Sequence, residues 1–99
     1  MVRIRWSDEA AADLEAIHAF IARDSLRYAS AVCAELVEAV DQPRVFPRSG
    51  RVVPEFQRED IREVLRGSYR IVYRMVEPAL VEIVTVFHGA RLLRLERTI

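Results

Sequence analysis

The residues best suited to chemistry gather in the last third of the sequence. Arg70 and Arg74 belong to a run that alternates polar with apolar side chains, and His88-Gly89-Ala90-Arg91 follows the last such run. Guanidinium groups bind phosphates and carboxylates through paired hydrogen bonds, and an imidazole exchanges a proton near neutral pH. The pattern therefore indicates a site for a polyanion, where His88 could act as a general acid or base.

A structural role for the same residues is the competing interpretation. On a sheet surface these arginines could pair with Glu63, Glu77 and Glu82, and His88 could be a turn residue. Spacing alone favours this interpretation. Arg62 and Arg66 could extend the arginine cluster, but the sequence does not fix the strand register that decides which face they occupy.

No motif for a metal or a cofactor is visible in the sequence. The two histidines, His18 and His88, are far apart and neither belongs to a ligand motif. The glycines at positions 50, 67 and 89 are isolated, so no Gly-x-Gly loop could cradle a phosphate. We therefore expect neither a metal nor a cofactor.

Charge is divided unevenly along a chain whose formal net charge is zero. Residues 1–43 hold four arginines and eight acids, a net charge of −4, whereas residues 44–99 hold eleven arginines and seven acids, a net charge of +4. A basic second half permits a simple RNA- or DNA-binding module. Because no helix-turn-helix or aromatic RNA-binding motif is present, we rank that function last.

Two tandem helices are predicted after a first strand. Val2, Ile4 and Trp6 alternate with arginines as in a half-buried strand, and Ser7 can cap a helix that begins near Asp8. Apolar residues then repeat at intervals of three and four over two stretches, from 10 to 21 and from 29 to 40. We expect the single cysteine, Cys33, to lie in the core as part of the second stripe.

Three strands are predicted in the second half. Residues 61–66, 69–76 and 80–87 are rich in β-branched and aromatic side chains, with short breaks between them. Prolines and a glycine mark residues 42–54 as a loop. The sequence thus predicts one α+β domain over residues 1–99, a small antiparallel sheet of order β-α-α-β-β-β with both helices packed on one face. No apolar stretch could span a membrane and no secretory signal is visible, so we expect a cytoplasmic protein.

Six short motifs, taken in order, resemble the ParE/RelE toxin superfamily of bacterial toxin–antitoxin systems. They are Trp6-Ser7, Asp13-Leu14 with Ile17, Gly50-Arg51-Val52-Val53-Pro54-Glu55, Arg62-Glu63-Val64, Tyr69-Arg70-Ile71-Val72-Tyr73-Arg74 and His88-Gly89-Ala90-Arg91. The resemblance covers nearly the whole chain. It implies the compact fold of that superfamily and one of two targets: RelE-like members cleave messenger RNA on the ribosome, and ParE-like members inhibit DNA gyrase.

Two missing residues favour the ParE-like branch. Arg70 and Arg91 match the ribonuclease branch, in which they and His88 would be the catalytic candidates. RelE also has a second basic residue on the preceding strand and a tyrosine after the last turn, where this chain has Val64 and Arg97. The resemblance therefore implies a gyrase inhibitor with no catalytic residue, and a RelE-like messenger RNA endoribonuclease is the alternative.

The resemblance also implies the partners and their contacts. We expect Arg70, Arg74, His88 and Arg91 to contact the target, which is gyrase or, in the alternative, the ribosome and its message. A ParD-like antitoxin is expected to fold onto the toxin and form a hetero-oligomer with it. Phe20 and Val37, at the margins of the helical stripes, are the predicted antitoxin contacts.

Overall fold

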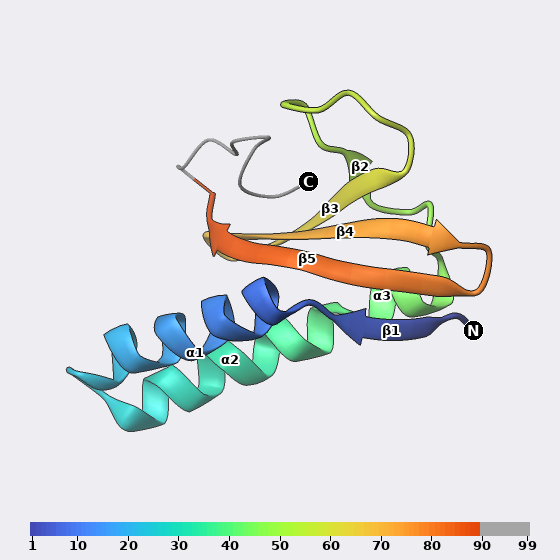
Figure 1. Cartoon of the computed structure of the whole chain (residues 1–99). Helices are drawn as coiled ribbons and strands as arrows, with labels where there is room; N and C mark the ends of the chain where they lie inside the picture. The colour runs from blue at the N-terminus through green and yellow to red at the C-terminus, as the bar shows by residue number, and fades with distance from the viewer. Residues whose placement is uncertain (90–99) are drawn as a thin grey trace.

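Helices and strands separate into two layers in the computed structural model, which describes residues 1–89 (Figure 1). The elements are β1 (Arg3–Trp6), α1 (Asp8–Ala22), α2 (Leu26–Ala39), α3 (Asp41–Val45), β2 (Arg51–Val52), β3 (Ile61–Arg66), β4 (Tyr69–Glu77) and β5 (Leu80–His88). The antiparallel α1–α2 hairpin lies against one face of the sheet, and its tip projects beyond the sheet (Figure 1). Within the described residues, no helix is long and apolar enough to cross a membrane.

The five strands form one sheet in the order β1-β5-β4-β3-β2. Strands β2 to β5 pair antiparallel with their neighbours, whereas β1 runs parallel to β5, with Arg3 opposite Leu80. The predicted α+β class and helix placement are confirmed. The sheet is mixed and not wholly antiparallel as predicted. The helices and three strands separate β1 from β5 in the sequence, and β5 then pairs parallel with β1.

Serine caps set where the two long helices begin. The Ser7 side chain accepts a hydrogen bond from the amide of Ala10, as predicted, and Ser25 caps α2 by accepting one from Tyr28. Pro43 was expected to lie in a loop, but it lies in the short helix α3. A proline fits there because amides in the first helical turn have no partner within the helix.

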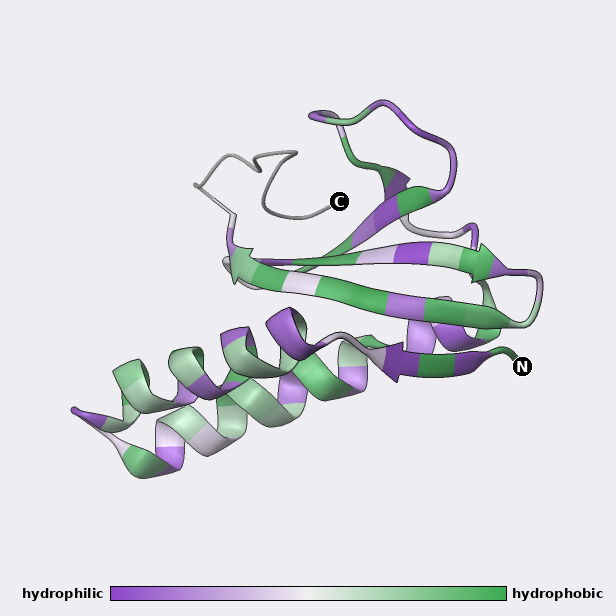
Figure 2. Ribbon diagram, in the orientation of Figure 1, coloured by the Kyte–Doolittle hydropathy of each residue, from purple (hydrophilic) through white to green (hydrophobic). Residues whose placement is uncertain are grey.

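Apolar side chains cover both faces of the sheet. The face toward α1 and α2 packs a core of buried residues that includes Ala10, Leu36, Val40, Ile71, Tyr73 and Ile83. The opposite face packs a second cluster formed by Val53, Ile61, Val72, Val84 and Phe87, with Phe56 partly buried against it. Strand β5 contributes residues to both clusters, and Figure 2 shows that it is hydrophobic along most of its length.

A β-bulge in β5 is held by the first helix. The pairing of β4 with β5 shifts between Val72 and Tyr73, so one additional residue of β5 lies at this point. There the Asp13 carboxylate of α1 accepts hydrogen bonds from the Thr85 hydroxyl and the Val86 amide. This contact fixes α1 beside the C-terminal end of β5, and therefore beside His88.

Cys33 is half-buried and not fully within the core. Its thiol lies 3.9 Å from the carbonyl oxygen of Leu14 in the neighbouring helix. Burial raises the pKa of the thiol. The residue therefore contributes to the contact between the two helices, in line with its predicted structural role.

Candidate functional site

The β3–β4 turn and the end of β5 meet at one corner of the sheet. The amide of Gly89 donates a 2.6 Å hydrogen bond to the carbonyl oxygen of Ser68. A Cβ at position 89 would lie 3.2 Å from that oxygen, and Gly67 has a φ of +57°, which favours glycine. The two glycines thus permit the close approach of the chain segments that carry His88 and Arg70.

A cavity of about 330 Å³ lies at this corner. Its described lining comprises Arg51, Leu65, Gly67, Ser68, Tyr69, Arg70, His88 and Gly89. Two of the predicted site residues, Arg70 and His88, therefore line one cavity, and Arg74 is not among its described lining.

Arg70 is buried within a network of carboxylates. Its side chain is 7% exposed, both terminal nitrogens donate to the two oxygens of Glu55 at 2.7 Å, and Nε donates to Glu63 at 2.7 Å. The guanidinium carbon also lies 5.0 Å from the ring centre of Phe87. The hydrogen bonds that Arg70 donates to Glu55, with a further contribution from Glu63, hold the pKa of Arg70 above its usual value.

The Arg70 network joins the segment 53–60 to the sheet. Glu55 lies in that segment, whereas Glu63 lies on β3 and also pairs with Arg51 of β2. Neither Glu55 nor the full role of Glu63 was predicted, because the pairing depends on the path of the chain between β2 and β3. The short motif Val53-Pro54-Glu55, an apolar anchor followed by an acid, was the available signal in the sequence.

Arg74 lies apart from Arg70, although both occupy the same face of β4. Arg70 is opposite Phe87 in β5, whereas Arg74 is opposite Glu82, with which it forms a 3.6 Å ion pair. The Arg74 side chain is 34% exposed. The structure therefore does not bring the two arginines into one cluster, and the Arg74 side chain is the more exposed of the two.

His88 lies at the corner itself, exposed and close to α1. It is opposite Tyr69, and the two rings pack edge to face with centres 5.8 Å apart. A second cavity, of about 260 Å³, lies between this pair and α1, where Phe20 also contributes to the lining. Arg91, the fourth predicted contact, lies outside the described residues.

Arg62 and Arg66 occupy the opposite face of the sheet from Arg70. They are opposite Tyr73 and Tyr69, on the side of the helices. Arg62 donates to backbone oxygens of the 48–50 segment and to Glu59, while Arg66 donates to the carbonyl oxygen of Glu35 in α2. The suggestion that they extend the Arg70 cluster is therefore wrong, since the register of β3 against β4 points them away from it.

Phe20 and Val37 remain exposed on the helix layer. Phe20 is 68% exposed and Val37 48% exposed, although both are large apolar residues. The interior stripe residue Leu36, one position before Val37, is only 1% exposed. The helix layer therefore has an inner stripe of buried residues and a margin of exposed apolar residues. Phe20 and Val37, the expected antitoxin contacts, lie on this margin.

Tyr73 is a buried positioning residue that the sequence analysis named only as part of the Tyr69–Arg74 motif. Its hydroxyl donates to the carbonyl oxygen of Pro47 and accepts from the amide of Gly50. Desolvation raises the pKa of this hydroxyl. These contacts fix the 47–50 segment, from which β2 and Arg51 enter the sheet.

Comparison with known proteins identifies one family. The family model described as the ParE toxin of the type II toxin–antitoxin system parDE matches residues 4–93. No individual curated protein matches the sequence at a significant level.

Two solved toxin–antitoxin structures share the fold. A chain of the chromosomal ParDE system from P. aeruginosa superposes with a TM-score of 0.71 at 22% identity, covering 89% of this chain and 96% of that one. A chain of the RelBE2 toxin–antitoxin complex from Mycobacterium tuberculosis superposes with a TM-score of 0.59 at 27% identity, covering 88% and 96% of the two chains.

Proposed function

We propose that this chain, which belongs to the ParE toxin family of type II toxin–antitoxin systems, inhibits DNA gyrase and is neutralised by a ParD-like antitoxin. It would bind gyrase and stabilise the cleaved-DNA intermediate, so that replication breaks the chromosome. No covalent step by the toxin is needed. The proposal places the toxin in the cytoplasm, where gyrase acts.

The burial of Arg70 is the observation that carries the choice of target. In the ribonuclease alternative this arginine would contact the message directly, but its side chain is 7% exposed and three of its N–H groups are bound by carboxylates. Val64 is buried in the core, and Arg62 is held by backbone oxygens on the other face. These positions support docking to a protein over catalysis on RNA.

The proposed target contacts are therefore His88 and Arg74, with Arg70 in a positioning role. His88 is exposed at the corner cavity, and Arg74 is partly exposed on the adjoining strand. Arg70 would act indirectly, by holding the 53–60 segment and Phe87 beside the corner. Arg91 stays a predicted contact.

A pair of parallel assays tests the choice of target. Purified chain is added to a gyrase supercoiling reaction and to a ribosome-dependent messenger RNA cleavage reaction. We expect inhibition only in the first, and a loss of inhibition of roughly tenfold for His88→Ala, since hot-spot contacts at interfaces contribute 1 kcal/mol or more. Arg27→Ala, an exposed arginine on α2, is the matched control and should inhibit normally.

Cleavage of ribosome-bound message with no effect on gyrase would replace this proposal with the ribonuclease alternative. In that case Arg70→Ala or Arg91→Ala should abolish cleavage.

The antitoxin is proposed to cover the exposed margin of the helix layer. Phe20 lines the cavity of about 260 Å³ beside Tyr69 and His88, so an apolar segment placed there would also approach the corner. Val37 lies on the neighbouring helix and is half-exposed. An antitoxin bound along this margin would bury both residues and restrict access to His88.

Substitution of the two exposed apolar residues tests the antitoxin surface. Phe20→Glu and Val37→Glu should each weaken binding to the antitoxin encoded beside this gene, measured by titration calorimetry, because a carboxylate would be buried without a partner. Val45→Glu on α3 is the control, since Val45 is also 48% exposed. Equal affinities for all three variants would contradict this placement.

A further inference from the structure

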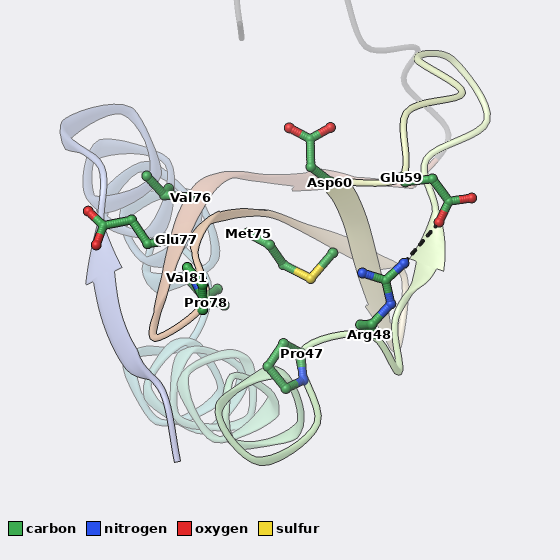
Figure 3. Close-up of a pocket in the computed structure, with 9 residues that line it drawn as sticks. All are labelled: Pro47, Arg48, Glu59, Asp60, Met75, Val76, Glu77, Pro78 and Val81. Carbon is green, nitrogen blue, oxygen red and sulfur yellow. Dashed lines mark hydrogen bonds and ion pairs between the residues drawn. The ribbon is translucent and has the colours of Figure 1, made fainter.

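The two edges of β5 have different partners along its length. One edge pairs with β4 from Leu80 to His88, whereas the other pairs with β1 only from Leu80 to Ile83. The end of β5 that β1 covers lies beside a cavity of about 540 Å³, whose described lining includes Pro78 and Val81 and no residue of α1 (Figure 3). Within residues 1–89, no strand continues along the second edge after Ile83.

The start of α1 takes the place of a strand at the point where β1 ends. The amide of Ser7 donates to the carbonyl oxygen of Ile83 at 3.0 Å, and its hydroxyl donates to the carbonyl oxygen of Val84 at 2.9 Å. The same side chain caps α1. The helix is thereby attached to the second edge of β5 from its first residue.

Asp13 extends this attachment toward His88. A single oxygen of its carboxylate, Oδ2, accepts hydrogen bonds from the Thr85 hydroxyl and the Val86 amide. Thr85 is 5% exposed and Val86 is 2% exposed, so removal of the carboxylate would take the acceptor away from two buried donors, which is costly. Val86 precedes His88 by two residues, and the contact therefore lies close to the end of the strand.

The contact at Asp13 determines where His88 lies relative to α1. Asp13 and Phe20 of α1 line the cavity of about 260 Å³, and Tyr69 and His88 line it from the sheet. Packing of the His88 ring on Tyr69 fixes its position relative to β4 but not relative to the helix. A binding residue contributes fully only when its neighbours hold it in the productive position.

We propose that Asp13 is a positioning residue for His88. The proposal rests on the proposed function, because Asp13 acts through His88 and its own carboxylate is engaged by β5. With the carboxylate in place, the end of β5 keeps His88 at a fixed distance from α1. Without it, this end of the strand separates from α1, and His88 spends only part of its time where it fits the target.

A double-mutant cycle tests whether Asp13 acts through His88. Asp13→Ala should weaken gyrase inhibition by the purified full-length chain roughly fivefold, a smaller loss than that expected for His88→Ala. Activities are corrected for the folded fraction, measured by circular dichroism. In a His88→Ala background the same substitution should have no further effect, because the contact that it positions is gone.

Two further variants separate the hydrogen bonds from the charge. Asp13→Asn should inhibit like the original chain, since one amide oxygen can accept both bonds. Glu15→Ala removes an exposed acid from the same helix and should also inhibit normally. Together they show whether the acceptor at position 13, and not the net charge of α1, is what matters.

The ring signals of His88 distinguish a failure of this proposal from a failure of the proposed function, because they are recorded by NMR on the free chain. Asp13→Ala should shift or broaden them and speed exchange of the Val86 amide proton, whereas Asp13→Asn should leave both unchanged. Thr85→Val removes only the hydroxyl donor and should give a smaller change in the same direction, so it decides the matter if Asp13→Ala does not fold. If the original chain leaves gyrase untouched, the proposed target fails, and the ring signals still decide the role of Asp13.

Unchanged His88 signals in Asp13→Ala would overturn the proposal. An equally large loss of inhibition with and without His88 would do the same, because Asp13 would then act through overall stability or through contacts of its own. Failure of Asp13→Asn to restore inhibition would also contradict positioning by hydrogen bonds.

Discussion

At the scale of single residues, Arg70 is the residue whose role the structure changes most. Replacing a buried cation and both of its carboxylates together by apolar residues changes stability little. Removing only one of the partners leaves a buried charge uncompensated, which is strongly destabilising. Arg70 thus holds its neighbours in place and does not present itself to solvent.

We predict that Arg70→Met lowers the free energy of unfolding by about 3 to 5 kcal/mol, because Glu55 and Glu63 lose their shared cation. Arg74→Met, which removes only the longer pair with Glu82, should cost less than about 1 kcal/mol. Urea unfolding of both variants measures the difference. Trypsin should also cut faster after Arg58 in Arg70→Met, since the 53–60 segment loses its attachment. Equal stabilities of the two variants would show that the network is not what holds the segment.

Tyr73 gives a prediction for alkaline pH. Its folded-state pKa is raised by burial, so the neutral hydroxyl contributes stability below the unfolded-state pKa, and this contribution is lost as pH rises through the folded-state pKa. We expect the melting temperature to fall above about pH 10, the usual range of tyrosine. Tyr73→Phe should be less stable at neutral pH by about 1 to 3 kcal/mol, through the lost hydrogen bonds, and should show a smaller alkaline decline. A decline of the same size in both proteins would assign it to other groups.

Alternation along β4 was enough to predict which of its residues share a face. Tyr69, Ile71, Tyr73 and Met75 do line the helix side, because a strand places successive side chains on opposite faces. The partners of Arg70 were not predictable in the same way. Glu55 and Glu63 reach it only through the path of the 53–60 segment and the pairing of β3 with β4, which no local pattern specifies.

At the scale of elements, the junction of the 47–50 segment with β4 depends on Gly50. A Cβ at this position would lie 2.5 Å from the Tyr73 hydroxyl oxygen and 2.7 Å from the carbonyl oxygen of Glu63. Glycine is therefore required for the close approach of two chain segments, and not for a turn.

We predict that Gly50→Ala destabilises the protein by about 1 to 3 kcal/mol, the usual cost of overpacking. Gly67→Ala is the comparison: a Cβ there meets no atom within 4 Å, but the φ of +57° costs about 1 to 2 kcal/mol for a residue other than glycine. Tyr73→Phe should rescue part of the Gly50→Ala effect and none of the Gly67→Ala effect. Denaturant midpoints of the single and double variants measure this coupling.

The sequence predicted the long elements and missed the short ones. The two helices and the three last strands have strong periodicity and clear caps or breaks. α3 and the two-residue β2 are too short to show a period. Each is held by residues distant in sequence: the Val2 amide donates to the Arg44 carbonyl oxygen, and Arg51 lies opposite Glu63. The parallel pairing of β1 was equally beyond local patterns, because it depends on a strand more than seventy positions later.

At the scale of the whole molecule, the two halves of the chain are joined through β5. This strand lies between β1 and β4 in the sheet, and Asp13 of α1 binds its bulge. Strand β5 is therefore the main contact between two parts of the molecule. The helices and β1 lie on one side of it, and β2 to β4 lie on the other.

We predict that a chain ending at Ala79, and so lacking β5, does not fold. Both apolar clusters lose members with β5, including Ile83 from one and Phe87 from the other. The expected result is circular dichroism without cooperative thermal unfolding, and rapid amide exchange throughout. Addition of a synthetic peptide of residues 80–89 in excess should restore protected amides in β1 and β4. A cooperative transition in the truncated chain alone would contradict this view of β5.

The parallel pairing of β1 with β5 also affects when a folded copy of the toxin can first form during synthesis. Domains fold as their parts emerge at about 5 to 20 residues per second, but here β1 has to wait until β5, which begins at Leu80, has been synthesised. A half-made copy on the ribosome would have no completed sheet and no finished corner at His88. The surface at His88 would therefore form only after β5 has been synthesised, and any toxic activity would begin no earlier.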